Sequence, residues 1–144
     1  MKISYGITVH NESDELNKLL EILIHKTDNK NSVIEKSTGD YIFHIDADEY
    51  PNETLLEQLK QIIEMNDNVD LIWIPRVNTI KGMTQEHIQK WGWRVTENDW
   101  VNYPDYQARV FRNDKDIRWT RPLHEHITGC KTYAHLPPHE ELSL

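Results

Sequence analysis

The sequence has 144 residues, with 24 acidic and 16 basic side chains and a formal net charge of −8. This length predicts one compact domain, residues 1–144, with a hydrophobic core that needs no disulfide to support it. The acidic balance argues against nucleic-acid binding, which requires a basic surface. Cys130 is the only cysteine, so an intramolecular disulfide is excluded and a reducing, cytoplasmic compartment is expected. No apolar run approaches the ~20 residues that a membrane helix needs, and residues 1–5 hold too few apolar side chains for a signal peptide.

The chain opens with the pattern of a strand, a polar loop and a helix. Residues 3–9 alternate and are rich in β-branched side chains, which predicts a first strand. A polar loop with capping residues spans 10–14, and the helix after it has one apolar face made by Leu16, Leu19, Leu20, Leu23 and Ile24. This order is the first half of a βαβ unit. A short helix near 31–35, ended by Gly39, precedes the next strand.

The stretch 39–49 (GDYIFHIDADE) is the most informative part of the sequence. Its apolar residues suit a buried strand that is covered on both faces. Asp46 and Asp48 alternate along an extended backbone, so their side chains project to the same side. Hard oxygen ligands of this kind suit Mg²⁺ or Mn²⁺, and open α/β sheets bind ligands beyond the carboxyl ends of their strands. The alternative is that Asp48 or Asn52 only caps the next helix, but the third acid, Glu49, favours a cation site.

Strand and helix patterns alternate through the rest of the chain. A helix is expected over 53–65 and a strand over 69–75. Region 76–102 is irregular, with a short helix near 85–90, and its Trp91, Trp93 and Trp100 form either the wall of a binding cleft or a small satellite core. The remaining pattern predicts a strand at 107–112, a turn at 113–116, a strand at 117–119 that pairs back as a hairpin, and a short strand at 131–134.

Four segments, taken together and in order, resemble glycosyltransferase family 2 of the GT-A fold. They are 7–12 (ITVHNE), 39–49 (GDYIFHIDADE), 106–112 (YQARVFR) and 119–126 (WTRPLHEH). The first looks like the family's first strand and nucleotide loop, the second like its Asp-x-Asp strand, and the last like a segment that carries a His-Glu pair. The resemblance implies a single GT-A-like (Rossmann-like) domain, a three-layer α/β/α sandwich with a mostly parallel central sheet. It also implies the transfer of a sugar, with inversion, from a nucleotide-diphosphate donor such as a UDP-sugar to an acceptor.

For the chemistry, the resemblance implies a bound Mn²⁺ or Mg²⁺ that stabilises the charge of the departing diphosphate. Asp48 is the expected direct ligand, and Asp46 is expected to touch the ribose, or the metal through water. GT-A enzymes often add a late histidine, which points to His124 or His126. Inversion needs a base to deprotonate the acceptor hydroxyl, and the candidates are Glu125 and Asp105, with Glu49 behind them.

The remaining candidate residues are expected to contact the nucleotide-sugar donor. They are Thr8, His10, Asn11, Lys36, Asp46, Ala47 and Arg109. Within the late segment, His124 and His126 are two residues apart and face one way on an extended strand, whereas Glu125 faces the other way. A metal ligand and a base in this segment therefore require a turn, for which Gly129 provides the flexibility.

One departure from the family pattern bears on the donor. Family members usually have a second strand that ends in an acidic loop holding the nucleotide base, whereas here Ile24 is followed almost directly by the segment before the acidic strand. Modest discrimination between bases is therefore expected. Two other functions remain open: a nucleotide-sugar or carbohydrate binder without turnover, and a metal-dependent phosphohydrolase or nucleotidyltransferase, although the sequence has no Gly-rich phosphate loop.

Overall fold

The structure is a computed structural model that describes residues 1–8, 30–120 and 125–144. The loop predicted at 10–14 and the helix predicted around Leu16 to Ile24 lie outside the described residues. The strands are β1 (Ile3–Thr8), β2 (Tyr41–Asp46), β3 (Leu71–Arg76), β4 (Asp105–Arg112), β5 (Arg118–Thr120), β6 (His126–Thr128) and β7 (Tyr133–His135). The helices are α2 (Lys30–Lys36), α3 (Glu53–Met65) and α4 (Gln85–Trp91), with a 3₁₀ turn, η1, at Glu140–Leu142.

Five strands form the central sheet, in the order β1-β2-β4-β3-β7. β1 pairs with β2 and β3 with β7 in parallel, whereas β4 pairs antiparallel with both β2 and β3. Four strands therefore run in one direction and β4 alone runs against them, which confirms the mostly parallel α/β sheet. The carboxyl ends of β1, β2 and β3 and the start of β4 consequently meet at one edge of the sheet.

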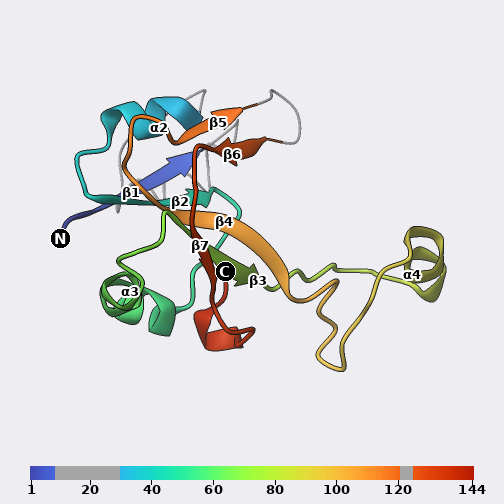
Figure 1. Ribbon diagram of the computed structural model, residues 1–144. Coiled ribbons are helices and arrows are strands. Elements are labelled where there is room, and N and C mark those ends of the chain that lie inside the picture. Colours follow the sequence, from blue (N-terminus) through green and yellow to red (C-terminus); the bar gives the residue numbers. More distant parts are fainter. Residues whose placement is uncertain (9–29, 121–124) are drawn as a thin grey trace.

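Both faces of the sheet are covered, because alternate side chains of β2 enter two separate cores. Tyr41, Phe43 and Ile45 pack with the apolar face of α3. Ile42 points the other way and packs with α2 and with Trp119 of β5. Figure 1 shows α3 and η1 on one side of the sheet and α2 with the β5–β6 pair on the other. The predicted three layers are present, with a small two-stranded sheet contributing to one outer layer.

The strand at 117–119 does not pair back on β4, so that part of the sequence prediction is wrong. β5 instead pairs antiparallel with β6 in a separate two-stranded sheet. The reason is that β2 and β3 already occupy both edges of β4. Gly129 ends β6 with a φ of 91°, and a Cβ there would lie 2.0 Å from the carbonyl oxygen of Asp116, so the turn depends on glycine.

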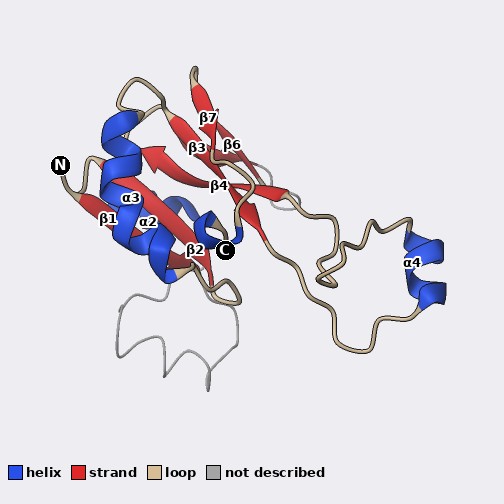
Figure 2. Ribbon diagram, turned by 90° about the horizontal axis from the view of Figure 1, so that it is seen from below, coloured by secondary structure: helices blue, strands red, loops and turns tan. Residues whose placement is uncertain are grey.

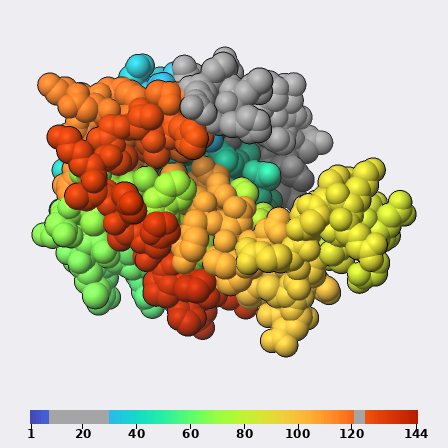
Figure 3. Space-filling view, turned by 45° about the vertical axis from the view of Figure 1, so that its right-hand side comes forward, coloured from blue at the N-terminus to red at the C-terminus, as the bar shows by residue number. Residues whose placement is uncertain are grey.

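Residues 77–104 form an arm that carries α4 away from the body of the molecule (Figures 2 and 3). α4 buries none of its residues. The rings of Trp91 and Trp93 are 4.8 Å apart, and Trp91 is 52% exposed. Trp91 therefore lies on the surface of the arm and is not part of a satellite core. In the part of the chain that the structure describes, no helix has the length and apolar character needed to span a membrane.

Candidate functional site

The charged residues at the carboxyl edge of the sheet come from three strands. Asp46 is the last residue of β2 and pairs across the ladder with Thr8, the last residue of β1. Arg76 ends β3 and pairs with Asp105, which begins β4. The charged side chains of Asp46, Arg76 and Asp105 are thus brought to one edge, as expected for ligand sites of open α/β sheets.

The chain turns sharply after β2, and this turn separates the three acids. The amide of Glu49 donates to the carbonyl oxygen of Asp46 at 3.0 Å, and the Asp46 amide donates back to Oε2 of Glu49 at 3.0 Å. Glu49 is consequently buried, with 6% exposed. Asp48 is exposed at the tip of the turn and makes no ion pair with any described residue. One closed turn therefore buries Glu49, leaves Asp46 half-buried and presents Asp48.

The helix cap next to the turn removes the simplest alternative explanation for Asp48. Asn52 is the N-cap of α3, and its Oδ1 accepts a hydrogen bond from the amide of Thr54 at 3.0 Å. The preferred capping role is therefore filled by Asn52. Asp48 lies four residues earlier and is not needed to begin the helix.

Two cations neutralise Asp46. Nη2 of Arg109 lies 2.5 Å from Oδ2 of Asp46, and Nζ of Lys30 lies 3.3 Å from its Oδ1. Burial by itself raises the pKa of the Asp46 carboxyl, but the positive charges of Arg109 and Lys30 outweigh burial and hold this pKa below its usual value. Asp46 is therefore ionised at neutral pH and faces cations that the protein itself supplies.

The ion pairs continue from Arg109 along the carboxyl edge. The same Nη2 of Arg109 lies 2.6 Å from Oε1 of Glu49, and Nη1 of Arg76 lies 3.0 Å from that oxygen. Arg76 also contacts Oδ2 of Asp105 at 2.6 Å, and the side-chain amide of Asn78 donates to the same oxygen at 2.9 Å. Acids and bases alternate, so each buried charge has an opposite partner, as buried charges require.

The late segment returns to this edge through Lys30. Its Nζ lies 3.0 Å from Oε2 of Glu125 and 4.7 Å from the centre of the Trp119 ring. The side-chain amide of Asn31 exchanges two 2.9 Å hydrogen bonds with the backbone of Trp119, which fixes β5 against α2. Lys30 therefore pairs with both Glu125 and Asp46 and links the late segment to the end of β2.

The other predicted residues are placed less centrally. His126 is exposed at the start of β6. Lys36 is exposed at the C-terminal end of α2. It lies near the start of β1, because the backbone amides of Thr38 and Gly39 donate to Oγ of Ser4. Ala47 lies half-buried within the turn. Four predicted residues have side chains that the structure does not describe: Thr8 is described only by its backbone, and His10, Asn11 and His124 lie outside the described residues.

His44 lies beneath the site, on the same face of β2 as Asp46. It is 1% exposed, its ring packs edge-on against Trp119 at 5.4 Å, and its Nε2 lies 3.9 Å from Oδ1 of Asp46. Burial, together with the positive charges of Lys30 and Arg109, lowers the pKa of His44 to about 3. The imidazole is therefore neutral at physiological pH.

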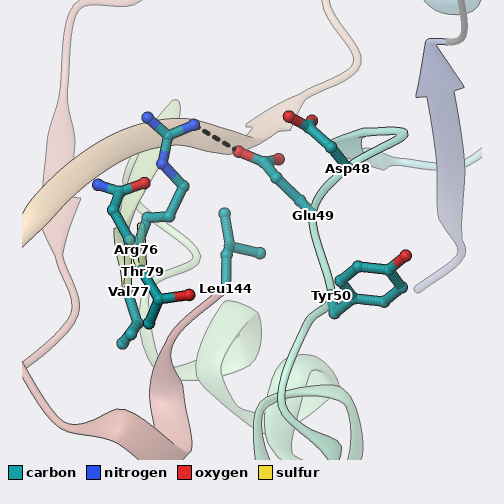
Figure 4. Close-up of a pocket in the computed structure, with 8 residues that line it drawn as sticks. Asp48, Glu49, Tyr50, Arg76, Val77, Thr79 and Leu144 are labelled. Carbon is teal, nitrogen blue, oxygen red and sulfur yellow. Dashed lines mark hydrogen bonds and ion pairs between the residues drawn. The ribbon is translucent and has the colours of Figure 1, made fainter. Parts of the chain in front are cut away.

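A pocket of about 500 Å³ opens beside the turn. Its lining residues are Asp48, Glu49, Tyr50, Arg76, Val77, Asn78, Thr79 and Leu144. Figure 4 shows the Arg76 guanidinium joined to Glu49, with the carboxylate of Asp48 beside them. The pocket is therefore lined by one acid without an ion pair among the described residues and by a charge-balanced Arg76–Glu49 pair.

The residues present fit a hard divalent cation that is held partly by the protein and partly by a bound substrate. Among the described residues there is no group of three or more His, Cys, Asp or Glu side chains placed to enclose a metal ion. Mg²⁺-type sites commonly use one or two carboxylates together with substrate phosphates and water. The free carboxylate of Asp48 suits this arrangement, and Asp46 faces Lys30 and Arg109 instead.

The fold is GT-A-like, with an acidic cluster at the carboxyl edge of its sheet, and comparison with known proteins identifies the family. The model of glycosyl transferase family 2 matches residues 25–135, so the chain belongs to that family. The crystal structure of residues 1–349 of S. aureus TarS is similar in fold, with a TM-score of 0.53 and 14% sequence identity. The match covers 94% of this chain and 58% of the TarS chain. No curated protein matches the sequence.

Sequence reasoning did not single out Lys30 or Arg76. Arg76 directly follows the predicted strand 69–75, so the rule that placed Asp46 at a carboxyl end would also have found it. Lys30 lies in a polar tract, DNKN, that has no periodicity. Only the packing of α2 against β5 brings Lys30 to Asp46 and Glu125.

Proposed function

We propose that the protein transfers a sugar, with inversion, from a UDP-sugar to an acceptor, in a reaction that depends on Mn²⁺ or Mg²⁺ bound at Asp48. The observation that carries the proposal is the difference between the three acids. Asp46 and Glu49 are held by cations of the protein, whereas Asp48 is exposed, has no ion pair among the described residues and lines a pocket. A carboxylate presented in this way is suited to a metal–diphosphate ligand.

The proposal gives each side chain a distinct task. When bound, the divalent ion neutralises the charge that develops on the departing diphosphate. Asp48 holds that ion, and Asp46, fixed by Arg109 and Lys30, orients the ribose or a metal-bound water. His124 and His126 remain the candidates for a further ligand from the late segment, and Thr8, His10, Asn11 and Ala47 remain candidate donor contacts. Lys36 lies beside the start of β1, away from this edge, and the buried Arg109 is held by Asp46 and Glu49, so neither is retained as a donor contact.

The first test is binding of nucleoside diphosphates. Isothermal titration of UDP, GDP and ADP, each with Mn²⁺ and with EDTA, is expected to give binding only with the metal. The three affinities are expected to lie within about tenfold, or roughly 1.4 kcal/mol, because the strand that usually carries the base-reading acid is missing from the sequence pattern. Equal UDP affinity in EDTA would refute the metal dependence, and a preference of several hundredfold for one base would refute the weak discrimination.

Glu125 is favoured over Asp105 as the base, because fewer donors hold its carboxylate. Among the described residues Glu125 makes one ion pair, with Lys30, whereas Oδ2 of Asp105 accepts from Nε and Nη2 of Arg76 and from Asn78. With fewer contacts to hold it, the Glu125 carboxylate can turn more readily toward the acceptor hydroxyl, which a base must reach.

We therefore expect Glu125→Gln to lower turnover by about a hundredfold or more while changing the affinity for Mn²⁺–UDP less than twofold. Turnover is measured as UDP release from UDP-glucose and UDP-N-acetylglucosamine with water as the acceptor. Asp105→Asn is the matched control and is expected to retain most of the rate. The reverse order of the two variants would move the base to Asp105, and UDP binding without any release by the parent would support a binder without turnover.

A further inference from the structure

We infer that Glu49 and Arg109 form a brace, here called the turn brace, which positions Asp46 and presents Asp48 to the ligand. Neither residue is a reacting group in this scheme, because both side chains are 3% exposed and contact each other at 2.6 Å. The effect of the turn brace on ligand binding rests on the proposed function. Its effect on the structure of the turn can be measured without a ligand.

The backbone of β4 is deformed at Arg109. Ile72 of β3 pairs with Val110, but the next residue, Trp73, pairs with Ala108. Arg109 is therefore the extra residue of a β-bulge, and bulges of this kind re-aim a side chain. The ladder between β2 and β4 also ends at the pair Phe43–Val110. Just past the end of that ladder, the Arg109 side chain crosses to Asp46 and Glu49.

Glu49 uses both of its carboxylate oxygens to close the turn. Oε2 accepts from the amide of Asp46, while Oε1 accepts from Nη2 of Arg109 and Nη1 of Arg76. The side chain thus links the turn after β2 to β4 and to the end of β3. An ionised carboxylate buried to this degree is tolerated only when it is paired and hydrogen-bonded, and here every bond that satisfies Glu49 also fixes the turn.

The brace accounts for the unequal environments of the acids. Arg109 contacts Asp46 and Glu49 through a single nitrogen, Nη2, and so draws together two carboxylates that otherwise repel. Asp48 lies between them in sequence, and its backbone is fixed on both sides while its side chain stays exposed. A ligand for a metal is most effective when its position is set in advance by such supporting contacts.

Glu49→Gln is the sharpest variant, because it changes one atom and removes the charge. In either orientation of the amide, its NH₂ group faces a donor: the Asp46 amide on one side, or the two arginines on the other. Hydrogen exchange of the Asp46 and Glu49 amides is expected to accelerate at least about tenfold relative to the other amides of β2. The affinity for Mn²⁺–UDP is expected to fall by at least about tenfold.

Substitutions of Arg109 separate positioning from general stability. Arg109→Lys retains a nitrogen that can lie between the two acids and is expected to keep part of the affinity for Mn²⁺–UDP, whereas Arg109→Met is expected to lose it. Arg112→Met is the matched control: Arg112 lies on the same strand, with its Nε 3.6 Å from Asp70 and its guanidinium over the ring of Tyr41. The control is expected to lower the melting temperature. It should leave the hydrogen exchange of the Asp46 and Glu49 amides and the affinity for Mn²⁺–UDP unchanged.

The results distinguish this inference from the proposed function. Unchanged exchange of the Asp46 and Glu49 amides in Glu49→Gln and Arg109→Met would overturn the brace, whether or not the parent binds a nucleotide. Accelerated exchange with parental Mn²⁺–UDP affinity would overturn its role in presenting Asp48. A parent that shows the protected turn but binds no UDP with Mn²⁺ would leave the turn brace in place and refute the proposed function.

Discussion

Replacement of Asp48 by Asn is expected to weaken Mn²⁺-dependent UDP binding by at least about a hundredfold, roughly 2.7 kcal/mol, without loss of the fold. Asp48 is the one acid in the turn that makes no ion pair with a described residue, and the substitution removes its charge. It also relieves repulsion from Asp46 and Glu49, so the melting temperature is expected to stay the same or to rise. Isothermal titration with Mn²⁺ and thermal unfolding measure the two effects.

Two comparisons make the Asp48 prediction specific. Asp116→Asn changes the net charge equally at an exposed position in the turn before β5, and it should leave UDP binding as in the parent. Asp46→Asn should instead lower the free energy of unfolding by about 2 kcal/mol, because Arg109 and Lys30 lose a charged partner. If Asp48→Asn binds UDP with Mn²⁺ as tightly as the parent does, the metal site lies elsewhere.

The free energy of unfolding is expected to fall by about 2 kcal/mol between pH 7.5 and pH 5 because of His44. The pKa of His44 is about 3 in the folded protein against an ordinary value of 6.5. Below pH 6.5 the unfolded chain therefore takes up a proton that the folded protein does not. The His44 contribution to stability is fully present above pH 6.5, decreases as the pH falls toward 3, and changes no further below that.

Urea unfolding at pH 7.5 and pH 5 tests the His44 prediction. In His44→Phe the loss of about 2 kcal/mol should disappear, because phenylalanine keeps an aromatic ring beside Trp119 and cannot be protonated. His126→Phe is the control, since His126 is exposed at the start of β6, and it should keep the parental pH dependence. An unchanged pH dependence in His44→Phe would show that another group is responsible.

The sequence alone determined the elements with a clear period and the place of the acids. The apolar face of 53–65 predicted α3 to the residue, because a 3.6-residue repeat of leucine and isoleucine is a local signal. The apolar run before Asp46 predicted β2, and the rule for carboxyl ends placed its acids at the site. The strand at 107–112 was also predicted, although β4 begins two residues earlier, at Asp105.

Only the tertiary structure decided which charges meet. Lys30, Asp46, Arg109 and Glu125 are far apart in the sequence, and no periodic pattern relates a lysine in a polar tract to a glutamate near the C-terminus. The bulge at Arg109 depends on how β4 pairs with β3, and the failure of 117–119 to pair with β4 depends on both edges of that strand being filled. The sequence therefore named Asp48 as the expected metal ligand but not the contacts of its neighbours, whereas long-range ion pairing holds Asp46 and Glu49 and leaves Asp48 exposed.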